Sequence, residues 1–302
     1  MNALTSLLRL ARPRQWVKNI FVFTALMFSG HVTQLDSILR ALMAFAAFCI
    51  AASSIYYLND FRDVEEDRKH PKKKNRPLAS GAIPVWTGAV GFAIGSIGSL
   101  VLSYVFLSTA TSLVMLTYLI LNLGYSLGLK HLVIIDVLFI ATGFVLRIMA
   151  GAAAISVMPS TWLVLCAVTI SLFLGFTKRR SEVVLLGDNA KKHRRVLADY
   201  NVAFLDQMIS IVTAATLVCY ILYTVDDHTV DLVGSRLLIL SVPFVLYGIF
   251  RYLYLVYHTQ SGGDPTRAVF TDIPLLITGF SWATLCTGVI LFGKNVLAFF
   301  LK

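Results

Sequence analysis

The chain has 302 residues, of which 57% are hydrophobic and 14% are charged, and its formal net charge is +10. Soluble domains are about a quarter charged, so this composition excludes a water-soluble globular fold. The positive charge does not indicate nucleic-acid binding. The basic residues lie in short segments between long apolar stretches, where the positive-inside rule accounts for them.

Nine apolar stretches predict helices that cross, or nearly cross, a hydrocarbon core of about 30 Å. The first and sixth are short, which is also compatible with an interfacial or tilted helix. We therefore expect an all-α, polytopic membrane bundle of about nine transmembrane helices that forms a single domain over residues 1–302. The predicted spans are 17–30, 37–58, 84–107, 109–129, 132–156, 161–177, 206–225, 235–257 and 273–293.

The distribution of basic residues predicts the orientation of these spans. With the N-terminus in the cytoplasm, most of the 26 Lys and Arg residues fall on the cytoplasmic side. The exceptions lie outside or within spans, and they are Arg40, Arg236, Lys294, Lys302, Arg147 and Arg251. Because positive charge is retained on the inner side, the N-terminus and the charged loops are predicted to be cytoplasmic.

Residues 53–81 contain the most informative motif, at the cytoplasmic end of the second predicted span. Asp60, Asp63 and Asp67 are spaced i, i+3 and i+7, which places them within about 60° of one another on a helix. Three carboxylates so close together repel one another unless a cation lies among them. Hard oxygen ligands suit Mg²⁺, with Mn²⁺ as a second candidate, and Mg²⁺ commonly binds substrate phosphates alongside one or two carboxylates.

Neighbouring polar residues extend this acidic face. Asn59 widens it and is a further candidate metal ligand, while Tyr56 and Ser53 continue it into the membrane. A polar stripe on an apolar helix is typical of a helix that faces a cavity rather than lipid. The alternative is a solvated acidic helix end, balanced by the basic residues that follow it.

Two segments of this region resemble a known family. Residues 59–68 and 75–81 read NDFRDVEEDR and NRPLASG. They resemble the first aspartate-rich motif of the UbiA superfamily of intramembrane prenyltransferases. The resemblance implies a helical bundle whose central cavity holds a Mg²⁺-bound diphosphate and opens to the cytoplasm and sideways to lipid. It also implies a location in a bacterial inner membrane.

The sixth predicted span ends in basic residues where aromatic-ring prenyltransferases of this superfamily carry a second aspartate motif. Residues 177–182 read TKRRSE, and KKHRR follows at 191–195. Cations here favour a donor with more negative charge than one diphosphate. Together with residues 12–19, 125–131 and 147–151, they resemble the branch that transfers 5-phosphoribose from phosphoribosyl diphosphate to a polyprenyl phosphate. The expected product is a precursor of cell-envelope arabinan.

Basic residues near the inner surface are predicted to bind the phosphates, Arg by bidentate pairing and Lys as a point charge. Arg147 lies within the fifth predicted span, where its partner is either a phosphate or a group on another helix. Asp136 shares its helix face but is about 16 Å away along the axis, so the two do not pair. The predicted substrate-binding residues are Lys18, Tyr56, Asn59, Arg68, Arg76, Tyr125, Lys130, Arg147, Lys178, Arg179 and Glu182.

Two other functions compete with this interpretation. An aromatic-ring prenyltransferase is disfavoured by the basic stretch 178–195. A transporter would be expected to have broken helices at mid-membrane, whereas the acids here cluster at one helix end. The run 72–74 is interpreted as a topology signal in contact with anionic lipid rather than as part of the site. An oligomer is compatible with all three functions.

Overall fold

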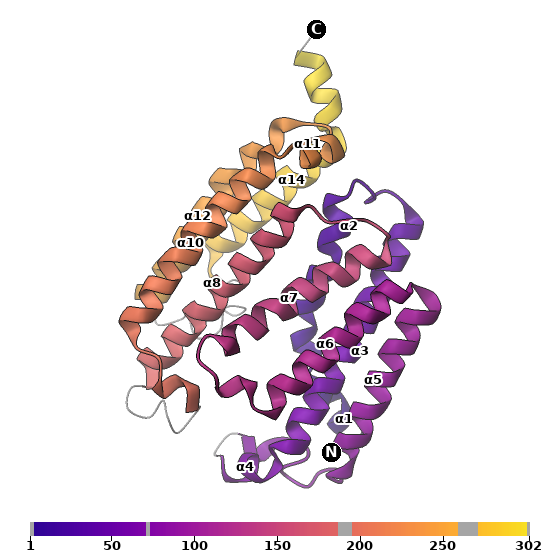
Figure 1. Cartoon of the computed structure of the whole chain (residues 1–302), viewed down its shortest axis with the longest axis vertical. Helices are drawn as coiled ribbons and strands as arrows, with labels where there is room; N and C mark the ends of the chain where they lie inside the picture. The colour runs from indigo at the N-terminus through magenta and orange to yellow at the C-terminus, as the bar shows by residue number, and fades with distance from the viewer. Residues whose placement is uncertain (1–2, 71–72, 187–194, 259–270, 301–302) are drawn as a thin grey trace. The chain divides into compact units, whose positions relative to one another are not determined.

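The computed structural model describes residues 3–70, 73–186, 195–258 and 271–300, and every regular element within these ranges is helical (Figure 1). Eight candidate membrane spans lie in this part of the chain. They are α3 (Leu35–Arg62), α5 (Trp86–Phe106), α6 (Thr109–Leu127), α7 (Ile135–Ala154), α8 (Thr161–Leu186), α10 (Val202–Val225), η6 (Arg236–Ser241) continued by α12 (Val242–His258), and α14 (Ile273–Phe300). The chain is a multi-pass membrane protein.

Large apolar side chains on the outside of the helices agree with a lipid environment. On α5, Ile94, Ile97 and Val101 are 68%, 63% and 54% exposed. In water such a surface would cost free energy in proportion to its apolar area, whereas lipid tails solvate it. Helical structure satisfies the backbone hydrogen bonds that the bilayer core cannot.

The first predicted span, 17–30, is not one continuous α-helix. Its residues form the end of the 3₁₀ helix η1 (Pro13–Phe23) and the short helix α2 (Thr24–Phe28), preceded by α1 (Ala3–Ala11). Arg12 interrupts the chain between α1 and η1 with a left-handed backbone, φ 50°. A 3₁₀ run this long is unusual, because its hydrogen-bond geometry is poorer than that of an α-helix.

The sixth predicted span is longer than expected. The prediction ended it at residue 177, whereas α8 continues to Leu186. Lys178, Arg179 and Glu182 therefore lie on a regular helix, where residues three and four apart face the same side. The second half of the basic stretch, 187–194, lies outside the described residues.

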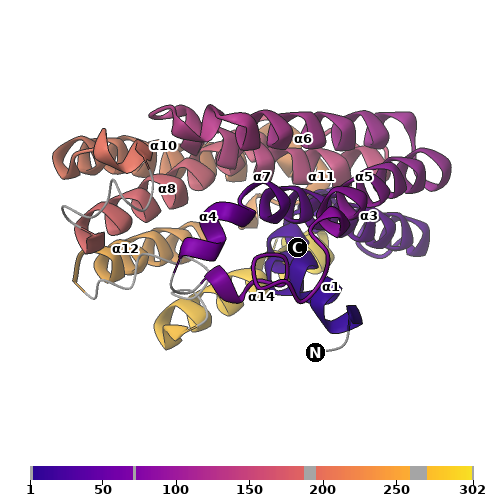
Figure 2. The ribbon, with the colours of Figure 1, turned by 90° about the horizontal axis from the view of Figure 1, so that it is seen from below.

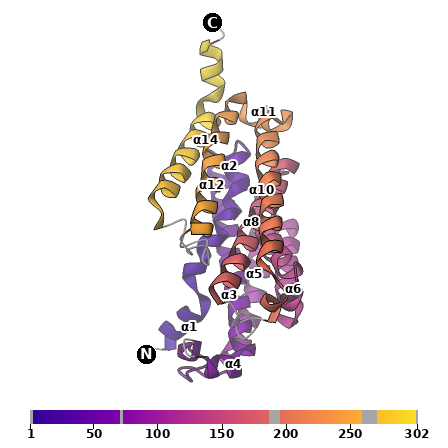
Figure 3. The same ribbon diagram turned by 90° about the vertical axis from the view of Figure 1, so that its left-hand side faces the viewer.

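The chain divides into two compact units. Unit 1 comprises residues 1–26, 31–127 and 146–158, and unit 2 comprises 27–30, 128–145 and 159–302. In unit 1, α3 packs against α5 and α6 (Figures 1 and 2) around buried residues that include Phe48 and Met115. In unit 2, α10 lies beside α8 and α12 beside α14 (Figure 3). Buried Phe173, Leu205 and Ile209 belong to its core.

Short helices connect these spans. Unit 1 contains α4 (Val64–Lys69) and η2 (Lys73–Asn75) directly after α3. Unit 2 contains η3 (Leu129–His131), η5 (Arg195–Ala198) and α11 (Asp227–Val233). Asp60, Asp63 and Asp67 lie at the junction of α3 and α4, and Lys130 lies on η3.

Candidate active site

The acidic motif lies where α3 ends and α4 begins. Asp60 is on the last turn of α3, Asp63 is the residue between the two helices, and Asp67 is on α4. The backbone keeps helical pairing across the junction, since Asp63 N donates to Asn59 O at 3.0 Å and Asp67 N donates to Asp63 O at 2.8 Å. Asp60 and Asp67 therefore stay on one side, as predicted, although the helix is interrupted at Asp63.

Two arginines hold the buried carboxylates of this motif. Asp60 and Asp67 are only 3% and 2% exposed. Arg76 Nη1 donates to Asp60 Oδ1 at 3.1 Å and to Asp67 Oδ2 at 2.7 Å. Arg12, which sequence reasoning did not select, also donates to Asp60 Oδ1. Buried carboxylates need such partners, because an unpaired buried charge is strongly destabilising.

The contacts of Arg76 test whether the motif fits a divalent metal ion. A single guanidinium nitrogen reaches both Asp60 and Asp67, so the two carboxylates converge on one point. Two carboxylates completed by water and substrate phosphates are a common Mg²⁺ site. Within the described residues, no three His, Cys, Asp or Glu side chains are arranged to hold a metal. The structure thus brings two of the three predicted carboxylates together.

Asn59 and Tyr56 have different partners around this pair. Asn59 Oδ1 accepts a hydrogen bond from Ser126 Oγ at 2.6 Å, and Arg62 Nη1 donates to Ser126 O at 2.5 Å. These bonds tie the end of α3 to the end of α6. The Tyr56 ring lies under the Arg12 guanidinium, 4.8 Å from its centroid, which is a cation–π distance. Tyr56 thereby helps to place Arg12 over Asp60.

Arg147 is buried in unit 1 and pairs with polar and aromatic groups. Its Nε donates to Asn19 Oδ1 at 2.8 Å and its Nη2 lies 3.4 Å from Tyr118 Oη. The guanidinium also lies 4.8 Å from the centroid of Phe48. At Gly151, one turn further on α7, a Cβ would collide with the carbonyl oxygen of Val22 on η1. Arg147 and Gly151, one helical turn apart, therefore allow η1 to pack closely against α7.

The remaining predicted residues of unit 1 are more open. Lys18 on η1 and Tyr125 near the end of α6 are half-buried. Arg68 is exposed, and its Nη1 pairs with Glu65 at 2.6 Å. Lys73, which we predicted to have no role in the site, lies 3.9 Å from Asp67 Oδ1. Lys73 therefore lies at the edge of the acidic cluster.

In unit 2, Arg179 forms a buried ion-pair network on α8. It is 1% exposed, and its Nε and Nη1 donate to Asp136 Oδ2 at 2.7 Å and to Glu182 Oε2 at 2.5 Å. The carboxylate of Asp136 binds Arg179 and Tyr200. This agrees with the prediction that Asp136 does not pair with Arg147. The prediction placed Arg179 on a substrate phosphate, whereas its described contacts are with protein carboxylates.

Tyr200 connects this network to a strained loop. Its hydroxyl donates to Asp136 Oδ1 at 2.8 Å and accepts from Ile134 N at 2.7 Å. Ile134 has φ 68°, a conformation that β-branched residues rarely adopt. Burial raises the pKa of the Tyr200 hydroxyl, which keeps it protonated as a donor. The loop that follows Lys130 is thus bonded to Tyr200, just before α10, and through Asp136 to Arg179 on α8.

Lys130 and Lys178 are less buried than Arg179. Lys130 on η3 is half-buried. The Lys178 side chain is 40% exposed and its Nζ is 4.0 Å from Glu182 Oε1. A lysine that reaches solvent can change partners at lower cost than a fully buried arginine, so these two fit the predicted phosphate contacts better than Arg179 does.

The sequence that carries the Asp60–Asp67 and Arg179–Asp136 clusters matches a known family. The UbiA prenyltransferase family model matches residues 19–272. The chain belongs to the UbiA prenyltransferase family. Its helical fold is also that of a UbiA homologue from Archaeoglobus fulgidus, solved with dimethylallyl diphosphate and Mg²⁺ (TM-score 0.71, 18% identity, 94% of this chain and 99% of the other).

Curated relatives in the UbiA family cover almost the whole chain. A decaprenyl-phosphate phosphoribosyltransferase of Corynebacterium glutamicum is 36% identical over 93% of this chain and 85% of the relative. One of Mycolicibacterium smegmatis is 33% identical over 93% and 91%, and one of Mycobacterium tuberculosis is 30% identical over 97% and 96%.

Sequence reasoning missed several residues that this UbiA-family chain uses to build the clusters. Arg12, Asn19, Ser126 and Tyr200 are polar residues that form hydrogen bonds with cluster residues 48 or more positions away along the chain. Arg12 carried a usable signal, because it stands directly before Pro13 within a basic segment. Ser126 and Tyr200 carried none, since a single Ser or Tyr at a helix end is commonplace.

Proposed function

We propose that the chain is a Mg²⁺-dependent glycosyltransferase that moves 5-phosphoribose from phosphoribosyl diphosphate to a polyprenyl phosphate. The observation that carries this is the convergence of Asp60 and Asp67 on one point, with Arg12 and Arg76 at its edge. That arrangement suits a metal-bound diphosphate. The relatives, named decaprenyl-phosphate phosphoribosyltransferases over nearly the whole chain, favour phosphoribosyl diphosphate as the donor.

The acidic pair and its arginines have complementary roles in this reaction. Asp60 and Asp67 supply the oxygens for Mg²⁺, which when bound offsets the negative charge that develops on departing diphosphate. The side chains of Arg12 and Arg76 are 29% and 28% exposed. They reach solvent and can turn from carboxylate to phosphate, which guanidinium groups bind with strong charge-assisted hydrogen bonds. Asp63 and Asn59 complete the proposed set of metal ligands.

The second set of cations recognises the other phosphates. Lys130 and Lys178, with Lys18, are the accessible basic residues that we assign to the 5-phosphate of the donor and the phosphate of the acceptor. Arg179, Asp136 and Tyr200 fix the elements that carry Lys178 and Lys130. We assign Arg179 this positioning role in place of the direct contact predicted from sequence.

The bond changes need no strong base. An oxygen of the acceptor phosphate, already ionised near neutral pH, bonds to C1 of the ribose. The bond from C1 to the diphosphate oxygen breaks, and diphosphate leaves with the electron pair. Positioning and electrostatic stabilisation therefore supply most of the acceleration. We place the reaction at the cytoplasmic side of a bacterial inner membrane, on the distribution of Lys and Arg.

A transfer assay tests the function. Purified protein in detergent would receive Mg²⁺, ribose-labelled phosphoribosyl diphosphate and a polyprenyl phosphate. We expect labelled lipid and released diphosphate, both lost on chelation of the metal. Parallel reactions would offer a polyprenyl diphosphate with 4-hydroxybenzoate. Prenylation of the aromatic ring, without use of phosphoribosyl diphosphate, would show that the chain is an aromatic prenyltransferase instead.

A further inference from the structure

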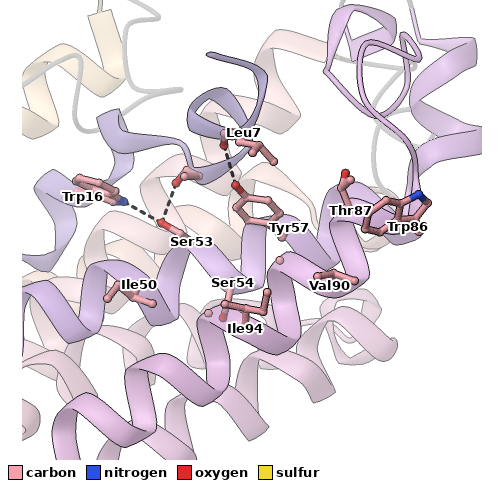
Figure 4. Close-up of a pocket in the computed structure, with 13 residues that line it drawn as sticks. Leu7, Trp16, Ile50, Ser53, Ser54, Tyr57, Trp86, Thr87, Val90 and Ile94 are labelled. Atoms are coloured by element: carbon pink, nitrogen blue, oxygen red, sulfur yellow. Dashed lines mark hydrogen bonds between the residues drawn. The ribbon is translucent and has the colours of Figure 1, made fainter. Parts of the chain in front are cut away.

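A groove of about 500 Å³ lies on unit 1 between the N-terminal segment, α3 and α5 (Figure 4). Its residues include Leu7 and Trp16 on one wall, Ile50 on α3, and Val90 and Ile94 on α5. The volume falls within the usual range for sites that hold small ligands, about 300–1,000 Å³. No residue that we placed at the metal or phosphate contacts lines it.

The polar side chains of the groove are already paired with protein groups. Ser53 Oγ donates to Ala11 O and accepts from Trp16 Nε1, both at 3.0 Å. Tyr57 Oη donates to Leu7 O at 2.8 Å, and Figure 4 shows that these bonds join the N-terminal segment to α3. A ligand that enters therefore meets an almost entirely apolar surface.

Close packing of α3 on α5 forms one side of this groove. A Cβ at Gly91 would collide with the Tyr57 ring, and a Cβ at Gly95 would approach Ser54 Cβ to 2.8 Å. The two glycines let the helices approach each other. At the rim, Trp86, Val90 and Ile94 on α5 are 63%, 42% and 68% exposed, so the groove opens towards lipid.

The groove leads to the acidic cluster along α3. Ser53, Tyr57 and Asp60 are spaced i, i+4 and i+7 and share one helix face, with Ser53 about 10 Å from Asp60 along the axis. On the opposite wall, Ala11 directly precedes Arg12, which binds Asp60. A molecule with a charged group at Asp60 and Arg12 can therefore extend an apolar tail into the groove.

We propose that this groove binds the isoprene units nearest the phosphate of the polyprenyl phosphate acceptor. This rests on the proposed function, because among its substrates only the acceptor combines an anionic head with a long apolar chain. Phosphoribosyl diphosphate is polar throughout, so the apolar lining of the groove would not stabilise it. A phospholipid offers a similar chemistry, and the experiment below separates the two.

Photo-crosslinking tests the occupant without requiring turnover. The probe is a polyprenyl phosphate with a diazirine in one of the isoprene units nearest the phosphate, added to the purified full chain without donor. We expect labelled peptides from α1, α3 and α5, and competition by unlabelled polyprenyl phosphate. Labelling elsewhere, or labelling that phosphatidylglycerol suppresses equally well, would overturn the proposal.

Paired tryptophan variants test the groove itself. Ile94→Trp fills its mouth, while Ile97→Trp adds the same bulk to a 63% exposed position on the same helix outside the lining. We expect only Ile94→Trp to abolish groove labelling. It should also raise the apparent KM for polyprenyl phosphate about three- to tenfold, a modest effect because the displaced tail is still solvated by lipid. The KM for phosphoribosyl diphosphate should stay unchanged.

The outcomes distinguish this inference from the proposed function. Groove labelling without any phosphoribosyl transfer would retain the groove and reject the function. Transfer with labelling unaffected by Ile94→Trp would retain the function and reject the groove. Should Ile94→Trp not fold, Val90→Phe, at another exposed lining position, replaces it under the same criteria.

Discussion

Two buried carboxylates, one in each unit, are held by arginines in different ways. The Asp60 side chain is 4% exposed, but its partners Arg12 and Arg76 are 29% and 28% exposed. In the pair of Asp136 with Arg179, the side chains are 0% and 1% exposed. In unit 1, Asp and Arg thus form an open cluster, whose arginines reach water. In unit 2, the same residue types form a closed pair, in which both side chains are buried.

The accessibility of the cation determines what such a cluster can do. An arginine that reaches solvent can release its carboxylate and be hydrated, or bind an arriving phosphate, at modest cost. An arginine sealed from water cannot, because breaking a buried pair leaves a charge that neither solvent nor protein stabilises. The first arrangement suits binding of charged ligands, and the second suits holding helices together.

Backbone strain accompanies both clusters. Arg12 and Ile134 have φ of 50° and 68°, a conformation that costs non-glycine residues about 1–3 kcal/mol each. In unit 1 the strained residue itself supplies the cation for Asp60. In unit 2 the strained residue, Ile134, lies two positions before Asp136, and its N–H donates to Tyr200, which also binds Asp136. In each case the strained residue is part of, or bonded into, the contacts around a buried carboxylate.

The largest expected effect is on the stability of unit 2. Arg179→Gln leaves Asp136 buried without its ion-pair partner, so we expect the free energy of unfolding in detergent to fall by about 3–5 kcal/mol. Arg236→Gln is the matched control, since Arg236 and its partner Asp227 are 80% and 91% exposed. Exposed pairs contribute at most about 1 kcal/mol. Similar losses in both variants would remove the distinction between closed and open clusters.

Activity should depend most strongly on the acidic pair of unit 1. Asp60→Asn and Asp67→Asn each remove one charged oxygen ligand, so we expect turnover to fall at least a hundredfold, or about 2.7 kcal/mol. The thermal midpoint in detergent should change little, because Arg12 and Arg76 become hydrated when their partner is neutral.

Glu66→Gln is the control for the acidic pair, because Glu66 lies on the same short helix and is exposed. It should leave turnover unchanged. If Asp60→Asn or Asp67→Asn kept more than about a tenth of wild-type activity at saturating Mg²⁺, a loss of less than 1.4 kcal/mol, that residue would not be an essential ligand.

Donor affinity should depend on the accessible lysine of α8. Lys178→Gln removes a charge-assisted contact worth about 1.5–3 kcal/mol, so the apparent KM for phosphoribosyl diphosphate should rise ten- to a hundredfold. The KM for polyprenyl phosphate should change much less.

The contact between Lys73 and Asp67 makes Lys73 unsuitable as a neutral reference for this measurement. Lys74, which is exposed on η2, serves instead. Equal changes in Lys178→Gln and Lys74→Gln would point to a general cationic surface rather than a specific phosphate contact.

The smallest expected effect concerns the link between Tyr200 and the strained loop. Tyr200→Phe leaves Asp136 and the Ile134 N–H short of one partner each, which should lower the free energy of unfolding by about 1–3 kcal/mol. Tyr257→Phe removes a comparable bond to Asp206 at an exposed position and should cost less. A larger loss in Tyr257→Phe would contradict the importance of the buried network.

The sequence predicted the elements that depend on local pattern. Apolar runs of membrane-spanning length identified eight of the spans, because the bilayer imposes both length and helicity. The i, i+7 spacing of Asp60 and Asp67 placed them on one side, because that relation follows from helix geometry alone. The first predicted span forms the end of a 3₁₀ helix and a short α-helix instead of one α-helix, because hydropathy does not distinguish these helix types.

Only the tertiary structure decided which charges pair and which remain accessible. Arg12 and Asp60 are 48 residues apart, and Arg179 and Asp136 are 43 apart. In the sequence both arginines stand in segments that contain other cations, and nothing local shows that Arg12 reaches solvent and that Arg179 is buried. Their difference arises from burial by helices that are distant along the chain, because solvent access is a property of the packed structure and determines the free energy of exchanging a charged partner.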